Sequence, residues 1–569
     1  MTATFSPGEC VAVAFHPDTG AAVVGEHGHS AAWPSGQADD AIAGLERDVG
    51  PRWVWWGPDT ARALVAAGVR PARCWDLDAV HRLLHGGWRA GPARVWAGAR
   101  ELDATDIPTI APVDLFHVAT QHEGDQVVRP DGHLDPGWID AGWHADIDSL
   151  SRWAELALQV QQAQDSALAG LDGRPAAPAT ARAESAASLL CAELEHDGLP
   201  IDVGTAETII ATSIGPRPTD AVDEARLAAE RDELVLRHLP FGDIDLRNPA
   251  NVKSLLRRAG IEVPDTRAWR LEQLRDQHPV VEALLAWRKA ERIATTFGYR
   301  WLDEHVGPDG RLRGRWSSSD GAAGRMTATA GLHNLPAELR SAVAAEHGHV
   351  FVRADLGQIE PRILATVSGD EALIAATLDD DMYAPVAARL GVTRDIAKVA
   401  VLGAMYGQTT GQGAVALRGL ESAYPTAMGY LADAARRAEG GNDLRTRGGR
   451  RVRMNGSPGS GNEDGPGRDE RSRAAARGRY GRNAMILGAA AEFFKTWAVI
   501  VRARAGAHGA QIVLCLHDEL LVDAPARDAE AVREIFDDGV QEARYRWSSG
   551  SGVRFVADTS VVARWSDAK

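Results

Sequence analysis

Two acidic residues stand where buried strands are predicted to end. Asp355 follows the run 350–354, and Asp518 follows the apolar run 512–516 after one histidine. Runs of this length rich in Val, Ile and Leu are typical of buried strands, and a carboxylate there costs free energy unless a partner offsets it. Mg²⁺ binds one or two carboxylates together with substrate phosphates, and two such ions about 4 Å apart serve in-line phosphoryl chemistry. Each aspartate taken singly also fits an ordinary turn at a strand end.

A second set of residues recurs at every fourth position. Arg394, Lys398, Leu402 and Tyr406 are spaced in this way, and Gly407 follows. Steps of four residues drift by only about 40° per step on an α-helix, so the four side chains share one face. Two cations followed by an aromatic ring suit a triphosphate that lies along a helix with its base stacked at the end. A solvated helix face has the same spacing, and that alternative stays open on spacing alone.

Together these segments resemble the polymerase module of family A DNA polymerases. Residues 355–362 resemble that family's first motif, Asp-Tyr-Ser-Gln-Ile-Glu-Leu-Arg. Residues 394–407 resemble its finger-helix motif, and residues 517–519, His-Asp-Glu, resemble its third motif. The motifs keep the family's order, and the resemblance covers roughly residues 185–569. It implies a template-directed DNA polymerase that acts on primer–template DNA and deoxynucleoside triphosphates (dNTPs).

The resemblance also implies a role for each matched residue. Two Mg²⁺ ions are expected on Asp355 and Asp518, and Glu519 either tunes this site or ligates a metal itself. Glu360 is expected to lie under the sugar of the incoming nucleotide and to exclude a 2′-hydroxyl, and Lys398 to protonate the leaving pyrophosphate. The other expected dNTP contacts are Arg394, Leu402, Tyr406, Gln358 and Tyr383. The expected DNA contacts are Arg325, Asn334, Arg479, Asn483 and His517, although a surface salt bridge is an alternative for each arginine.

Several residues depart from the family pattern, among them Leu356 and Gly357 in the first motif. Leu402 stands where the family has Phe or Tyr, Tyr383 replaces a histidine, and Leu487 replaces a glutamine. Pro361 interrupts the first motif, at a helix start where proline is tolerated. We expect these changes to affect rate, fidelity and the selection of nucleotide analogues.

The resemblance implies a multi-domain protein of α/β and α+β class, in which an RNase H-like domain of the exonuclease type precedes a right-hand polymerase. Residues 1–180 are expected to form a 3′–5′ exonuclease-like domain and residues 185–300 the thumb. The palm is expected from residues 301–365 and 484–569, and the fingers from residues 366–483.

The exonuclease-like domain is expected to be inactive. That chemistry needs an Asp-X-Glu on the first strand and further aspartates to hold two metals. The first predicted strand here reads Val-Ala-Val-Ala-Phe over residues 11–15, and Ala157 falls where the last aspartate belongs. The domain is therefore expected to serve as a scaffold, and a rearranged site on acidic residues such as Asp59 and Asp76 is the alternative.

Two functions other than a polymerase stay open, and the substitutions at residues 383, 402 and 487 suggest the first of them. The chain has 569 residues and a net charge of -16, but residues 436–482 contain 13 Arg and only six acidic residues, so DNA affinity is expected to be local. One rival is a non-catalytic nucleic-acid-binding protein on a polymerase scaffold, and the other is a metal-dependent nuclease. A nuclease has no need for the 394–406 helix face, and an inert scaffold has no need for both aspartates.

Cellular location is predicted from segments that the sequence lacks. The four cysteines have no metal-ligand spacing, and so few favour a reducing compartment. The N-terminus lacks the pattern of a signal peptide, and no apolar run reaches about 18 residues. We expect a monomer in the cytoplasm, associated with the nucleoid and without a membrane span.

Overall fold

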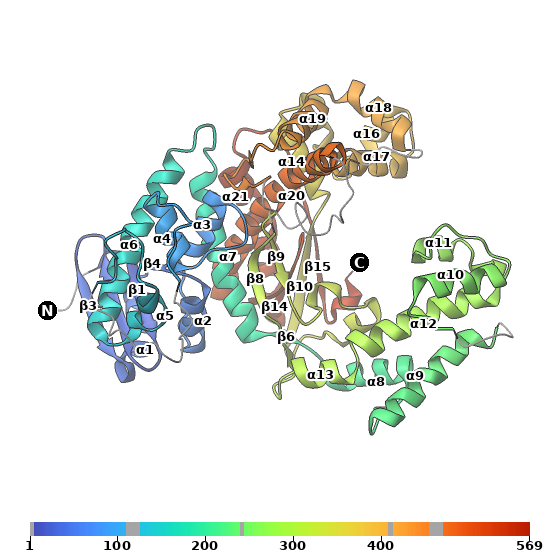
Figure 1. Cartoon of the computed structure of the whole chain (residues 1–569), viewed down its shortest axis with the longest axis horizontal. Helices are drawn as coiled ribbons and strands as arrows, with labels where there is room; N and C mark the ends of the chain where they lie inside the picture. The colour runs from blue at the N-terminus through green and yellow to red at the C-terminus, as the bar shows by residue number, and fades with distance from the viewer. Residues whose placement is uncertain are drawn as a thin grey trace, which may run out of the picture. The chain divides into compact units, whose positions relative to one another are not determined.

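The computed structural model describes residues 5–109, 126–238, 244–321, 323–407, 413–454 and 470–568. The chain forms two compact units, each built from separate segments (Figure 1). The first unit comprises Met1–Asp197, Arg315–Thr327 and Gly348–Val561. The second comprises Gly198–Gly314, Ala328–His347 and Val562–Lys569.

The first unit begins with a five-stranded sheet in the order β3-β2-β1-β4-β5. Its strands are β1 (Cys10–His16), β2 (Gly20–Gly25), β3 (Ser30–Pro34), β4 (Arg52–Trp55) and β5 (Cys74–Asp76). The first three strands are antiparallel, whereas β4 pairs in parallel with β1 and β5 in parallel with β4. Alternate residues of a strand point to opposite faces, so the sheet supports two apolar layers.

Helices cover both faces of this sheet. Val11 and Val13 of β1 pack in a core with α1 (Ser35–Asp48) and α2 (Pro58–Ala66). Ala12 and Ala14 pack in a second core with α6 (Ile147–Ala169). The remaining helices here are α3 (Leu77–His85), α4 (Pro92–Ala99), α5 (Pro136–Asp140) and α7 (Ala177–Asp197). Helix α7 runs unbroken across residues 180–185, where the domain boundary was expected.

A second sheet, in the order β13-β14-β10-β15, carries both predicted strand ends. Its strands are β10 (His349–Leu356), β13 (Gln511–Leu516), β14 (Glu519–Pro525) and β15 (Ala557–Val562). Strand β14 is antiparallel to both β10 and β13. Helices α20 (Glu470–Ala505) and α21 (Ala529–Ser548) pack on each other, and α21 also contacts β10 and β14.

Between β10 and α20 the chain is mostly helical. The helices are α14 (Ile359–Ser368), α15 (Glu371–Ala376), α16 (Tyr383–Leu390), α17 (Arg394–Tyr406), α18 (Gly413–Ala423) and α19 (Pro425–Glu439). A short ribbon of β11 (Leu444–Arg445) and β12 (Arg451–Val452) follows. Helix α17 begins after Thr393, whose hydroxyl caps it, and ends at Gly407, whose φ of 70° stops the helix.

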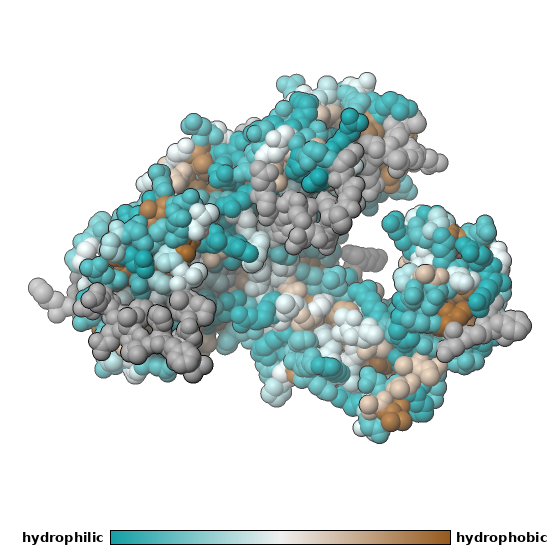
Figure 2. Space-filling view, in the orientation of Figure 1, coloured by the Kyte–Doolittle hydropathy of each residue, from teal (hydrophilic) through white to brown (hydrophobic). Residues whose placement is uncertain are grey.

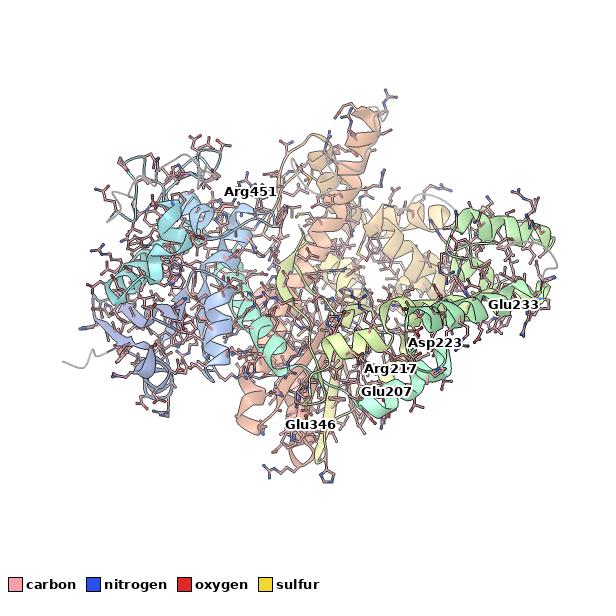
Figure 3. The ribbon with its side chains drawn as sticks, turned by 60° about the horizontal axis from the view of Figure 1, so that its bottom comes forward. Glu207, Arg217, Asp223, Glu233, Glu346 and Arg451 are labelled. Carbon is pink, nitrogen blue, oxygen red and sulfur yellow. The ribbon has the colours of Figure 1, made fainter. Side chains whose placement is uncertain are left out.

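The second unit is largely helical. Its helices are α8 (Val203–Ile214), α9 (Ala221–Leu236), α10 (Pro249–Arg258), α11 (Ala268–Glu272), α12 (Pro279–Thr296) and α13 (Tyr299–His305). Arg217 follows α8 and lies beside Glu207 (Figure 3), with a 2.9 Å ion pair to that residue and a 2.7 Å pair to Asp303. The second unit also contains a two-stranded sheet of β6 (Leu199–Pro200) and β7 (Arg311–Leu312). Another two-stranded sheet, of β8 (Trp316–Asp320) and β9 (Arg325–Ala328), belongs to the first unit except for Ala328.

One helix has the length and composition of a membrane span. It is the segment Glu470–His508, and 89% of its apolar window is buried inside the protein. The window admits charged residues, so it is not the uninterrupted apolar run that the sequence analysis considered. Glu492 and Lys495 interrupt the stretch, and packing within the fold accounts for its apolar surface. The face drawn in Figure 2 is mostly hydrophilic, with small separate apolar patches.

Candidate active site

The structure brings Asp355 and Asp518 together at one end of the second sheet. Asp355 lies opposite Glu519 in the β10–β14 register. Asp518 lies in the tight turn that joins β13 to β14, and its carbonyl accepts a 2.9 Å hydrogen bond from the backbone N–H of Leu356. Asp518 therefore reaches β10 from a hairpin turn, not from an adjacent strand as the sequence suggested.

The two carboxyl groups repel each other. Burial, and then the charge of Asp518, raises the pKa of Asp355 to about 7. Burial also raises the pKa of Asp518. A pair of partly buried carboxylates with raised pKa values is a place where a bound cation lowers the free energy of the charged state.

Arg353 is a member of this site that the sequence reasoning missed. Its guanidinium donates a 3.1 Å bond to Asp355 and a 2.7 Å bond to Glu519. Residues 353 and 355 share one face of β10 because side chains alternate along a strand. An arginine inside an apolar strand needs a partner, and that signal could have predicted the contact.

Glu360 and Tyr406 meet, although they are 46 residues apart. The Tyr406 hydroxyl donates to both carboxylate oxygens of Glu360, at 3.0 and 2.8 Å. Arg325 donates to the same carboxylate at 3.0 Å. Burial, and then the bond to Glu360, raises the pKa of Tyr406 to about 12. The first turn of α14 and the last turn of α17 are thereby joined.

Gln358 and Arg394 meet through Asp381, which the sequence reasoning also missed. Gln358 donates a 2.9 Å bond to the Asp381 carboxylate and accepts one of 2.9 Å from the N–H of Met382. Arg394 forms an ion pair with the same carboxylate, and its guanidinium lies 5.8 Å from the ring centre of the buried Tyr383.

The predicted face of α17 is present. Arg394 and Lys398 are exposed, Tyr406 is 36% exposed, and Leu402 is half-buried. The opposite face is buried against neighbouring helices through Ala397, Ala400, Val401, Ala404 and Met405. The cationic side chains therefore lie on a surface that a ligand can reach.

The residues predicted to contact DNA are dispersed. Arg479 is exposed on α20, and its side chain lies against Gly407, where a Cβ would stand 3.1 Å from the arginine Cγ. Asn483, one turn further along, has a buried Oδ1 for which the structure records no hydrogen bond. His517 is exposed and strained, with a φ of 35°. Asn334 belongs to the second unit, so its place relative to the site is not defined.

The donor set fits a metal only in part. Across the residues that the structure describes, no group of three or more His, Cys, Asp or Glu side chains forms a metal cluster. The Asp355 and Asp518 pair has the oxygen ligands and the like-charge repulsion that suit Mg²⁺ bound jointly with substrate phosphates.

Comparison with known proteins defines the class. The family described as DNA polymerase family A matches residues 245–567, more than half of the chain. A solved structure, the POL domain of Pol1 from M. smegmatis in complex with DNA primer-template and dNTP, superposes with a TM-score of 0.67 at 21% identity, covering 99% of this chain and 96% of that one. The fold is therefore that of the family, with mixed helical and sheet content.

Known proteins with similar sequences are also DNA polymerases. DNA polymerase I of Chloroflexus aurantiacus is 30% identical over 343 residues, which cover 55% of this chain and 35% of that protein. Thermostable DNA polymerase I of Thermus aquaticus is 28% identical over 299 residues, which cover 48% and 35%. The matches thus span about a third of these relatives' length. The chain belongs to DNA polymerase family A.

Proposed function

We propose that this protein is a DNA-directed DNA polymerase that adds deoxynucleotides to a primer 3′-hydroxyl. The observation that carries the proposal is the shared site. Arg325 links the parts of this site: its guanidinium bonds Glu360 in the Glu360–Tyr406 contact, and its charge opposes the rise that burial causes in the pKa of Asp518. Asp518 in turn acts on Asp355, whose pKa its charge raises. Family membership supports the same conclusion.

The proposed chemistry divides among the residues of the site. Asp355 and Asp518 would hold two Mg²⁺ ions, which when bound lower the pKa of the attacking hydroxyl and neutralise the leaving oxygens. Arg394 and Lys398 bind the triphosphate from the exposed face of α17, and Lys398 supplies a proton to the pyrophosphate. Arg353 holds the carboxylates of Asp355 and Glu519 in fixed positions.

We further propose a right-hand layout. The β13-β14-β10-β15 sheet with α20 and α21 would be the palm, and α15 to α19 the fingers. The helices of the second unit would be the thumb. The β3-β2-β1-β4-β5 order of the first sheet supports an RNase H-like domain of the exonuclease type.

We propose that this N-terminal domain has no nuclease activity. The positions where metal-binding acids belong are occupied by the buried Ala12, Ala14 and Ala157. Trp56 and Trp153 stack beside them at 4.4 Å, and the Trp56 indole N–H donates to the Trp153 carbonyl at 3.1 Å. An apolar, packed layer of this kind does not fit a pair of hydrated cations.

Primer extension with Mg²⁺ and the four dNTPs tests the proposal. Asp355→Asn and Asp518→Asn should each lower the extension rate by about a thousandfold or more, since each removes a metal ligand. Primer–template affinity should stay within a few-fold, and Asp538→Asn, an exposed residue of α21, should behave like the unmodified protein. Full-rate extension by either active-site variant would refute the assignment. DNA binding without extension by the unmodified protein would favour the scaffold alternative.

A further inference from the structure

A small cavity in the first unit is lined by four arginines. It has a volume of about 140 Å³ and lies between the segment before α7, helix α19 and the β11–β12 ribbon. Its cationic residues are Arg174, Arg437, Arg445 and Arg447. None of them takes part in the catalysis proposed above.

The positive charge in this cavity is not neutralised within the described chain. No carboxylate is recorded in ion-pair range of any of the four guanidiniums, across the ranges that the structure covers. Asp433, the one acidic residue that lines the cavity, pairs with Arg436 at 3.1 Å. Burial first, and then the charges of Arg451 and Arg174, lowers the pKa of Arg445, with Asp443 acting in the opposite direction. Burial, and then the charge of Arg174, lowers the pKa of Arg447. Like charges held this close raise the free energy of the empty cavity.

Backbone carbonyls hold the guanidiniums in place. Arg174 donates to the carbonyl of Arg445 at 3.2 Å, and its buried Nε has no recorded hydrogen-bond partner. Arg445 donates to the carbonyls of Gly449 at 2.6 Å and Leu84 at 3.2 Å. Arg447 donates to the carbonyl of Trp547 at 3.3 Å. Neutral carbonyls orient these groups and leave their charge available to an anion.

We propose that this cavity binds a small oxyanion of the phosphate class, either inorganic phosphate or pyrophosphate. Planar guanidiniums present paired N–H groups that match phosphate oxygens, and four of them suit a polyvalent anion better than a carboxylate or chloride. The occupied cavity would tie the segment before α7 to α19 and to the ribbon, because one ligand would contact all three.

Calorimetric titration of the full-length protein tests this proposal. Phosphate and pyrophosphate are titrated separately in EDTA, with chloride buffers of matched ionic strength. We expect saturable binding of at least one anion, weakened at least fivefold by Arg174→Gln and by Arg447→Gln. Arg527→Gln removes an exposed guanidinium that does not line the cavity and should change the affinity less than twofold. Any pyrophosphate bound at α17 should be weakened by Arg394→Gln but not by Arg174→Gln, which separates that binding from the cavity.

One further variant and one further ligand test the same proposal. If Arg174→Gln proves unstable, Arg437→Gln replaces it. Arg437 is exposed, so this variant should fold normally, and it should weaken anion binding at least twofold. A single-stranded oligonucleotide supplies phosphate from another source. If its binding depends on Arg174 and Arg447 but that of free phosphate and pyrophosphate does not, the cavity belongs to a nucleic-acid groove and the proposal is wrong. Lack of saturable binding by both anions also overturns it.

Discussion

At the scale of single residues, the site depends on side chains that hold one another. Glu360 receives bonds from Tyr406 and Arg325, so neither its carboxylate nor the tyrosine ring turns freely. Arg353 fixes Asp355 against Glu519 in the same way. Such mutual support keeps charged groups oriented before substrate arrives, and it lowers the cost of ordering them during the reaction.

Glu360→Ala should raise the use of ribonucleotides relative to deoxynucleotides by about tenfold or more, because it opens space where a 2′-hydroxyl would lie and frees the Tyr406 ring. The ratio of kcat/KM for a matched pair of nucleotides measures this. Glu371→Ala, an exposed residue at the start of α15, should keep the original ratio. An unchanged ratio in Glu360→Ala would show that another residue selects the sugar.

Arg353→Gln should weaken the apparent Mg²⁺ affinity at least threefold with a smaller change in the KM for dNTP. The reason is that the two carboxylates lose the donor that positions them, whereas the triphosphate is bound from α17. Magnesium titration of the extension rate gives the first quantity and dNTP titration the second. Arg353→Lys keeps the charge and should restore part of the loss. Equal changes in both quantities would indicate a general structural role.

At the scale of elements, α14 is fastened by one buried cation. The Arg362 side chain is fully buried and donates to five backbone carbonyls, those of Gly357, Thr377, Asp379, Asp380 and Arg554. Burial lowers its pKa to about 10, which still leaves it charged at neutral pH. These bonds set the path of the loop that ends at Asp381, the residue that joins Gln358 to Arg394.

Arg362→Met should destabilise the protein by roughly 3–5 kcal/mol, because five backbone carbonyls lose the buried donor that they share and methionine supplies none. Differential scanning calorimetry should show a Tm lower by several degrees. Arg527→Met removes an arginine that is 86% exposed and should cost less than about 0.5 kcal/mol. A Tm shift in Arg362→Met as small as in that control would contradict the role given to Arg362.

At the scale of the whole first unit, helix α7 belongs to two structures at once. Leu189 and Ala192 pack in the core beneath the five-stranded sheet. Glu184 on the same helix pairs with Lys495 at 2.6 Å and with Arg450 at 2.6 Å, and all three side chains are buried. The helix therefore joins the N-terminal sheet to α20, and the two parts share one interior.

Removal of residues 1–180 should give an insoluble or aggregated protein, because it uncovers the apolar face of α7. Size-exclusion chromatography with light scattering measures this. Leu189→Asp and Ala192→Asp in the shortened chain should recover some solubility, since they place charge on the uncovered face. A soluble, monomeric shortened chain without those substitutions would show that the N-terminal domain is dispensable for folding.

The full-length protein should not degrade single-stranded or mismatched primers from the 3′ end, even with Mn²⁺. In the described part of the domain, alanines and stacked tryptophans fill the α6 side of the first sheet in place of carboxylate ligands. A labelled primer resolved on a denaturing gel provides the measurement, with Asp355→Asn present to prevent resynthesis. Mismatch removal by that variant would mean that the domain is a live nuclease.

The sequence by itself was enough to identify the family, the two aspartates at predicted strand ends and the cationic face of α17. These features reside in short segments whose spacing fixes their geometry: a strand end, a hairpin turn and one helix face. The family resemblance stated from the motifs is confirmed, and the roles given to single residues stay predictions until they are tested.

Only the tertiary structure decided which distant groups meet. Glu360 bonds a residue 46 positions away, and Lys495 bonds Glu184 across 311 positions. Arg353, Asp381 and the double role of α7 were not predicted for the same reason. Local sequence patterns specify the secondary structure of each segment. A buried charge needs a partner to offset its free-energy cost, and packing of the whole chain decides which residue that is. Because that partner can lie anywhere in the sequence, local patterns do not predict it.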